Sequence, residues 1–302
     1  MLKNLLLLTS CFLGVNGSLR ELRGQESVRS EYADRGMVVS DSSHASRIGR
    51  DIIARGGNAV DAAVATAFAM TVTWPEAGNI GGGGFMLIRP ANGMPPVCID
   101  YRETAPIASR GDMFEIGENR YTRKLVGVPG TVRGLELAHE RYGSLPWKDL
   151  VLPATRLATD GFSVDSFLAD STNRILDATK DDPLYKELHR VYGKPNGARW
   201  AVGDVMKLPD LGRTLVVIAE QGADAFYEGR LADLLLDEMN RSGGLIRRQD
   251  LVSYKAVVRE PIIGSYRDYK IIGAPPPSSG GIAIVQGLNM VEAVDLPREK
   301  FT

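Results

Sequence analysis

Cysteine and histidine are scarce in this sequence. Its 302 residues include two cysteines, Cys11 and Cys98, and three histidines, His44, His139 and His189. The histidines lack the short spacings of metal ligands and Cys98 is isolated, so the sequence indicates no metal site. If Cys11 is removed with an N-terminal signal, the mature chain has no intramolecular disulfide and depends on its hydrophobic core for stability.

Net charge is small, and long apolar runs are missing. The formal charge at pH 7 is -1 and the sequence pI is about 6.4. Nucleic acids and anionic membranes attract basic surfaces, so bulk charge gives no reason to expect either partner. The strongest apolar run after the N-terminus, residues 60–74, is too short for a membrane span and contains Asp61, so it predicts a buried helix. With 44% hydrophobic and 24% charged residues, the composition is typical of a soluble globular protein.

Residues 1–17 are typical of an export signal. Lys3 provides a positive start, residues 5–15 form a short apolar core, and small residues follow at the expected cleavage point. We therefore expect a signal peptide over residues 1–17, a lead-in over residues 18–33, no membrane span beyond the signal, and a periplasmic or secreted protein. Two alternatives stay open: a buried N-terminal helix that is not exported, and lipoprotein processing at Cys11.

The rest of the chain shows both helical and strand patterns. Apolar residues at a period of 3.6 with glycine or proline stops predict helices over residues 43–55, 59–70, 131–142, 147–160, 210–221, 230–240 and 279–290. Short apolar runs bounded by turn residues predict strands over residues 85–88, 97–101, 257–263 and 269–274. Residues 180–209, rich in charge, proline and glycine, are expected to form a long excursion outside the core. Helix pairs beside strand pairs indicate one layered α+β domain.

Four consecutive glycines at residues 81–84 precede the first predicted strand. Glycine has no Cβ, so such a cluster lets the backbone approach another group closely. It does not fit the G-x-G-x-x-G phosphate motif and does not open a helix, so a tight packing turn is the better interpretation. The strand at residues 85–88 is expected to be buried on both faces and to pair antiparallel with residues 97–101, because an Asn-Gly turn separates them. Arg102 then emerges at a strand end.

The sequence resembles gamma-glutamyltransferases, also called gamma-glutamyltranspeptidases or glutathione hydrolases, of the N-terminal-nucleophile hydrolase class. Six motifs occur in the order of that family: GMVV at residues 36–39, GGNAVDAA at 56–63, GGGGFML at 81–87, RETAP at 102–106, VPGT at 128–131 and PPPSSGG at 275–281. The resemblance runs from about residue 32 to about residue 295. It implies an αββα layered sandwich, incomplete in this chain, with residues 34–302 forming a truncated large-subunit region. It implies no metal or organic cofactor.

Arg102 is the strongest candidate binding residue. A guanidinium presents a planar fork of donors that matches a carboxylate bidentately, and it stays charged when partly desolvated. In the resembled family the arginine of this motif holds the α-carboxylate of the γ-glutamyl group, and the match assigns that role to Arg102. Glu103 either orients the guanidinium or caps local structure. Ser278 and Ser279 lack a G-x-S-x-G context and a paired histidine, so helix capping is predicted for them rather than nucleophilic attack.

A threonine nucleophile is missing from the sequence. Precursors of the resembled family cut themselves before a threonine in a Thr-Thr-His-Phe-like stretch, and that threonine then attacks substrate with its own amine as base. No such stretch occurs here. The resemblance therefore implies most of a large subunit without a catalytic residue, inactive alone, whose partner is a small subunit from the same precursor or from a separate chain.

The expected activity of the complete enzyme is cleavage of the γ-glutamyl amide bond of glutathione and related compounds. The glutamyl group would pass to water, amino acids or peptides. Two alternatives stay open. Cephalosporin acylases and poly-γ-glutamate-processing transferases share the scaffold, and Arg102 does not exclude them. An inactive exported fragment, or a binding module, would retain a carboxylate pocket without chemistry.

Overall fold

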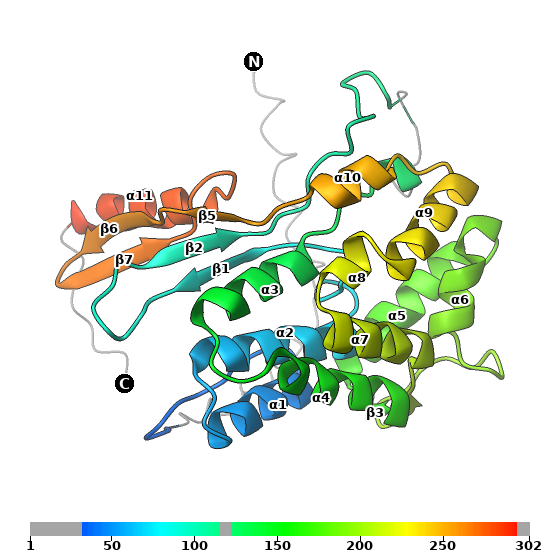
Figure 1. The fold of residues 1–302 in the computed structure, drawn as a ribbon, viewed down its shortest axis with the longest axis horizontal. Coiled ribbons are helices and arrows are strands. Elements are labelled where there is room, and N and C mark those ends of the chain that lie inside the picture. Colours follow the sequence, from blue (N-terminus) through cyan, green and yellow to red (C-terminus); the bar gives the residue numbers. More distant parts are fainter. Residues whose placement is uncertain (1–31, 115–116, 118–121, 295–302) are drawn as a thin grey trace, which may run out of the picture. The chain divides into compact units, whose positions relative to one another are not determined.

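A computed structural model describes residues 32–114, 117 and 122–294 of the chain. The chain divides into two compact units, residues 1–35 and 36–302. Of the first unit the structure describes only residues 32–35, which form no helix or strand. The predictions of a signal peptide and of lipoprotein processing at Cys11 lie outside the described residues. Everything below concerns the second unit (Figure 1).

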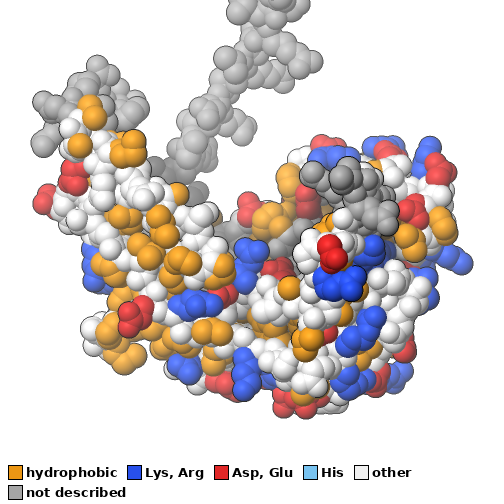
Figure 2. Space-filling model, turned by 90° about the horizontal axis from the view of Figure 1, so that it is seen from above, with side chains coloured by type: hydrophobic (Ala, Val, Ile, Leu, Met, Phe, Trp, Pro, Cys, Tyr) orange, Lys and Arg blue, Asp and Glu red, His pale blue; other side chains and the backbone are white. Residues whose placement is uncertain are grey.

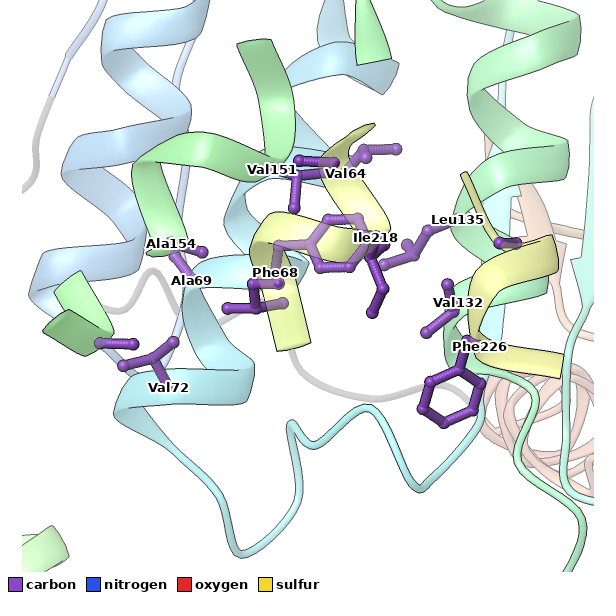
Figure 3. Close-up of a cluster of buried hydrophobic side chains, with 14 of the residues drawn as sticks. Val64, Phe68, Ala69, Val72, Val132, Leu135, Val151, Ala154, Ile218 and Phe226 are labelled. Carbon is purple, nitrogen blue, oxygen red and sulfur yellow. The ribbon is translucent and has the colours of Figure 1, made fainter. Parts of the chain in front are cut away.

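Four helices pack side by side into one layer of the second unit. They are α1 (Ser43–Ala54), α2 (Ala59–Thr73), α4 (Trp147–Asp160) and α7 (Pro209–Gln221), each in contact with the next (Figure 1). Helix α3 (Thr131–Tyr142) packs on both α2 and the sheet. Figure 3 shows the core at this junction, where Phe68 of α2 lies among Val151 of α4, Ile218 of α7 and Leu135 of α3. All four of these side chains are 0% exposed.

The principal sheet has three antiparallel strands in the order β1-β2-β5. They are β1 (Phe85–Ile88), β2 (Val97–Asp100) and β5 (Val257–Arg259), and Phe85 pairs with Asp100 at the first rung of the predicted hairpin. The prediction that β1 is buried on both faces is wrong, because Leu87 is 43% exposed. Met86 and Ile88 pack against the core, so alternation places Leu87 on the opposite face of an edge strand.

The strand predicted over residues 257–263 is two strands. Strand β5 ends at Arg259 and joins β2, whereas β6 (Ile262–Tyr266) pairs with β7 (Tyr269–Gly273) in a separate hairpin. Pro261 lies between them, and a proline has no N–H to donate to a ladder, so the chain leaves one sheet and enters another there. Helix α11 (Gly280–Glu292) packs on this hairpin, with Gly273 and Gly281 in close contact.

Residues 180–209 are more structured than expected. They contain η2 (Pro183–Tyr185), α6 (Lys186–Tyr192) and β4 (Val205–Met206). Strand β4 pairs with β3 (Phe162–Ser163), and this pairing brings Met206 and Leu208 into the core, each 1% exposed. The end of the segment therefore belongs to the core, in contrast to the predicted excursion.

The remaining elements surround this framework. They are η1 (Arg123–Leu125), α5 (Ser166–Thr179), α8 (Asp224–Tyr227), α9 (Arg230–Ser242) and α10 (Arg248–Ser253). Among the described residues no helix has both the length and the apolar character needed to cross a membrane.

Candidate functional site

The glycine cluster forms the packing turn that its composition predicts. The Gly82 carbonyl accepts hydrogen bonds from the Gly130 and Thr131 N–H groups at 2.8 and 3.0 Å, at the start of α3. Gly84 exchanges two backbone hydrogen bonds with Tyr101, of 3.2 and 2.9 Å, and a Cβ on Gly83 would overlap the Tyr101 carbonyl. The glycine cluster thus connects β1, the end of β2 and the start of α3. These contacts lie beside Tyr101, the residue before Arg102.

Arg102 lies directly after β2, as the motif predicts. Its N–H donates to Asp100 Oδ1 at 3.0 Å, and its carbonyl accepts from the Tyr254 hydroxyl at 2.8 Å. The side chain is 55% exposed, with Nε 3.3 Å from Glu103 Oε2 and Cζ 6.0 Å from the centre of the Phe85 ring. The guanidinium therefore has a carboxylate neighbour along one edge and is accessible to a ligand carboxylate.

Glu103 contacts the guanidinium rather than the local backbone. Its side chain is 33% exposed, and its contact with Arg102 is an adjacent-residue ion pair. A carboxylate beside Nε limits the orientations of the guanidinium, and the orienting role of Glu103 stays a prediction.

Buried polar groups support the backbone beneath Arg102. The Asp100 side chain is 7% exposed and accepts from Arg259 Nε at 2.7 Å. Burial raises the pKa of Tyr101 to about 12, with a smaller contribution from Cys98. Burial also raises the pKa of Tyr254, reinforced by neighbouring tyrosines and carboxylates, so its hydroxyl keeps the proton that it donates to the Arg102 carbonyl.

Two cavities of the described residues are lined without Arg102 or Glu103. One, of about 430 Å³, lies between α1 and α4 and is lined in part by Arg47, Arg55 and Arg156. The other, also about 430 Å³, is lined by α5, α6 and the Pro75–Glu76 turn. The Arg102 side chain, which is 55% exposed, lines neither of these two cavities.

The other sequence candidates have structural partners. Ser278 Oγ accepts from the Gly280 N–H at 3.2 Å at the start of α11, whereas Ser279, the N-cap residue, makes no side-chain cap bond. His139 is half-buried, with Nε2 2.7 Å from the Leu145 carbonyl oxygen and its ring beside Trp147, so it is not a solvated surface residue. Within the described ranges, histidine, cysteine, aspartate and glutamate side chains form no group of three that could hold a metal.

Comparison with known proteins identifies the family. A sequence profile described as Gamma-glutamyltranspeptidase matches residues 45–302. The chain belongs to the gamma-glutamyltranspeptidase family. The Glutathione hydrolase proenzyme of Escherichia coli (strain K12) is 44% identical over 276 residues, which cover 89% of this chain and 47% of that protein. The crystal structure of Helicobacter pylori gamma-glutamyltranspeptidase matches with a TM-score of 0.83 and 38% identity, over 90% of this chain and 79% of that one.

The fold of this gamma-glutamyltranspeptidase chain is the predicted α+β fold of N-terminal-nucleophile hydrolases. The chain spans about half the length of the curated relatives that it matches. These relatives include Acylase ACY 1 proenzyme of Pseudomonas sp. (strain SE83), which is 42% identical over 276 residues, covering 87% of this chain and 48% of that protein. The family thus contains members with an acylase name as well as glutathione hydrolases.

Sequence reasoning missed the residues that hold Arg102 in place. Asp100, Tyr254 and Arg259 bond to the Arg102 backbone directly or through one partner. Tyr254 and Arg259 lie more than 150 residues away along the chain and belong to no motif singled out in the sequence, so no local signal identifies them.

Proposed function

We propose that residues 34–302 are the large-subunit part of a gamma-glutamyltransferase, in which Arg102 binds the α-carboxylate of the γ-glutamyl donor. The observation that carries the proposal is the placement of Arg102 at the end of β2, with a fixed backbone, a flanking Glu103 and a half-exposed guanidinium. A partly exposed guanidinium can exchange water for a bidentate carboxylate contact without leaving a buried charge unpaired.

The chemistry of the complete enzyme follows from the family resemblance. The hydroxyl of the small-subunit threonine attacks the γ-amide carbonyl and gives its proton to the amine of the same residue. The C–N bond then breaks, the protonated amine leaves, and the acyl ester passes to water or to an amino group. The contribution of this chain is orientation: Arg102 holds the head group so that the γ-carbonyl lies at a fixed distance from the nucleophile.

The partner proposed for this chain is a small subunit, from the same precursor or from a separate chain. An apolar surface over β6, β7 and α11 supports it. Figure 2 shows hydrophobic side chains gathered on this side of the molecule. Exposed apolar residues of these three elements include Ile263, Tyr269, Ile284 and Met290, which are 49%, 71%, 56% and 73% exposed. A large exposed apolar surface marks an interaction site. The export signal predicted over residues 1–17 supports a periplasmic or secreted location.

The similarity to Acylase ACY 1 proenzyme supports a second candidate, an acylase that removes a different acyl group. The two functions differ in what Arg102 recognises. A γ-glutamyl donor carries an amino-acid head group, and an acyl donor without that group offers no α-carboxylate.

Enzyme kinetics test the proposal on a chimaeric precursor, in which the second half of the E. coli proenzyme follows the aligned end of this chain. We expect hydrolysis of γ-glutamyl p-nitroanilide by the chimaeric precursor and none by this chain alone. Arg102→Ala should raise the donor KM about 10- to 100-fold, because a charge-assisted hydrogen bond contributes about 1.5–3 kcal/mol. Arg102→Lys should recover part of the loss, since lysine keeps the charge but not the fork.

Arg110→Ala is the matched control. Arg110 is exposed, and among the residues that the structure describes its side chain pairs with nearby Asp112 alone, at 3.4 Å, so its removal should leave the donor KM unchanged. An Arg102→Ala enzyme with an unchanged donor KM would remove Arg102 from the donor site. A preference for an acyl donor without an amino-acid head group would favour the acylase function.

A further inference from the structure

The segment that carries Arg102 has almost no regular structure of its own. Residues 101–107 follow β2 as an irregular chain, apart from one β-bridge between Thr104 and Val128. Irregular surface segments are normally mobile, whereas a residue that orients a substrate must be held to within a fraction of an ångström. Contacts from elsewhere in the chain therefore have to supply the order.

Three side chains from one distant stretch supply these contacts: Asp250 and Tyr254 are buried, and Arg259 is half-exposed. The Tyr254 hydroxyl donates to the Arg102 carbonyl at 2.8 Å. Arg259 Nε donates to Asp100 Oδ2 at 2.7 Å, while Oδ1 of the same carboxylate accepts from the Arg102 N–H at 3.0 Å. Asp250 Oδ1 accepts from the Ile107 N–H at 2.7 Å. The three contacts join residues 143 to 159 positions apart in sequence.

We propose that Asp250, Tyr254 and Arg259, here called the clamp residues, are positioning residues that fix the Arg102 backbone for donor binding. This inference rests on the proposed function of Arg102. Both backbone polar groups of Arg102 are bound by side chains, so the Cα and the direction of the side chain are set. The guanidinium itself contacts only Glu103 and the Phe85 ring among the described residues, so the side chain adds little order of its own.

Two of the clamp residues, Tyr254 and Asp250, are themselves held in place. Tyr254 is 5% exposed, and its ring stacks on Tyr227 at 5.8 Å with an interplanar angle of 9°. The Tyr227 hydroxyl donates to the Pro129 carbonyl at 2.9 Å. Asp250 is 5% exposed and also accepts from the Arg247 N–H at 2.7 Å, at the start of α10. A side chain that is packed and bonded on two sides transmits a fixed position to its partner.

Gly130, at the start of α3, lies too close to the clamp for any residue with a Cβ. A Cβ on Gly130 would overlap both the Tyr101 carbonyl and the Tyr254 hydroxyl. The start of α3 therefore approaches the Arg102 segment as closely as backbone allows. The glycine cluster lies in the same layer, since the Gly82 carbonyl bonds the Gly130 N–H.

A network of this kind has a simpler alternative role, the stability of the fold alone. A double-mutant cycle separates the two roles, because residues that act through one another are not additive. Tyr254→Phe is the best single change, since it removes the hydroxyl and keeps the ring that stacks on Tyr227. The matched control is Tyr192→Phe, which removes the hydroxyl of a half-buried tyrosine on α6.

In the chimaeric precursor, Tyr254→Phe should raise the donor KM about 3- to 10-fold, the effect of one hydrogen bond. The kcat should stay within about twofold, because the contact with the donor carboxylate exists in both ground and transition states. Tyr192→Phe should change neither constant. In an Arg102→Ala background, Tyr254→Phe should cause no further rise in KM, whereas a purely structural role predicts equal effects in both backgrounds and would overturn the inference.

Amide hydrogen exchange on this chain alone tests the clamp without any activity. Peptides covering residues 100–107 should exchange several-fold faster in Tyr254→Phe and at the wild-type rate in Tyr192→Phe. Unchanged exchange in Tyr254→Phe refutes the clamp even if Arg102→Ala raises the donor KM. Faster exchange in Tyr254→Phe, together with an unchanged donor KM in Arg102→Ala, would show that the clamp orders the segment but that Arg102 does not bind the donor. The positioning role of the clamp residues would then also be wrong.

Discussion

Asp61 gives the sharpest test of how this chain is held together. It is 0% exposed, and its carboxylate accepts four hydrogen bonds from donors on two segments. Oδ1 accepts from the Ser144 and Leu145 N–H groups at 2.9 and 3.3 Å. Oδ2 accepts from the Asn58 N–H at 2.9 Å and from the Ser144 hydroxyl at 2.5 Å. The carboxylate thus closes the capping box of α2 and anchors the loop after α3.

The substitution Asp61→Asn keeps the shape and removes the charge. One of the two oxygen positions becomes an NH₂ group. If that group faces Asn58 and Ser144, the hydroxyl can turn and accept, but the Asn58 N–H is left without its acceptor. If it faces the other way, the Ser144 and Leu145 N–H groups both lose theirs. At least one buried N–H is therefore unpaired, which costs about 1–3 kcal/mol, and the remaining bonds lose their charge assistance. We expect a loss of about 2–3 kcal/mol of unfolding free energy at pH 7.

The loss should depend on pH. Burial alone would raise the pKa of Asp61, but the four hydrogen bonds outweigh it and hold the pKa below its ordinary value. In the unfolded chain an aspartate carboxyl has a pKa of about 3.9. Because the folded pKa lies below the unfolded one, the stabilisation is fully present above about pH 4 and disappears as the pH falls through the folded pKa. The difference between wild type and variant should therefore shrink in acid.

Urea unfolding at pH 7 and pH 3 measures this difference. Asp165→Asn is the matched control, because Asp165 caps α5 by one bond to the Leu168 N–H and asparagine caps equally well. The control should lie within about 0.5 kcal/mol of wild type. An Asp61→Asn variant as stable as wild type at pH 7, or equally destabilised at both pH values, would refute the reasoning.

Two further predictions concern the core and the buried thiol. Phe68→Ala should lower the unfolding free energy by about 3–5 kcal/mol, since Phe68 is 0% exposed and packs edge-on to Trp147 at 5.3 Å. Phe167→Ala, at an exposed position, is the control. A loss below about 1 kcal/mol in Phe68→Ala would contradict the packing. Burial, with a smaller contribution from the Asp100 charge, raises the pKa of the Cys98 thiol. In a Cys11→Ser chain, Ellman's reagent at pH 8 should therefore label Cys98 only after denaturant is added. Rapid labelling of the native chain would show that the thiol is accessible.

The helices and the first hairpin could be predicted because short-range features determine them. Asn58 and Asp61 form the capping box three residues apart, and the pattern of apolar residues that follows fixes the buried helix α2. The hairpin of β1 and β2 follows from an apolar run, an Asn-Gly turn and a second run. The position of Arg102 then follows from strand length alone.

The contacts that make the Arg102 site specific could not be predicted. Tyr254 directly follows the short helix α10 and belongs to no motif in the sequence. Only the fold brings its hydroxyl to the Arg102 carbonyl. A proline such as Pro261 indicates an edge position in a strand, yet local sequence does not say that the two sides of it join different sheets. The burial of Met206 could not be predicted either, because it depends on pairing with Phe162, 44 positions earlier in the chain.

Helix α11 shows where this chain needs a further layer. It is apolar on nearly all sides, yet only Gly281 among its residues is buried. A helix that is apolar all round is normally covered on all sides, and the β6–β7 hairpin covers one. Each large apolar side chain gains about 1.5–3 kcal/mol when fully buried, so leaving several of them exposed forfeits a sizeable part of the 5–15 kcal/mol that stabilises a typical domain. The same small subunit that would cover α11 would also supply the threonine nucleophile proposed to attack the donor that Arg102 holds, so one proposed partner accounts for both features.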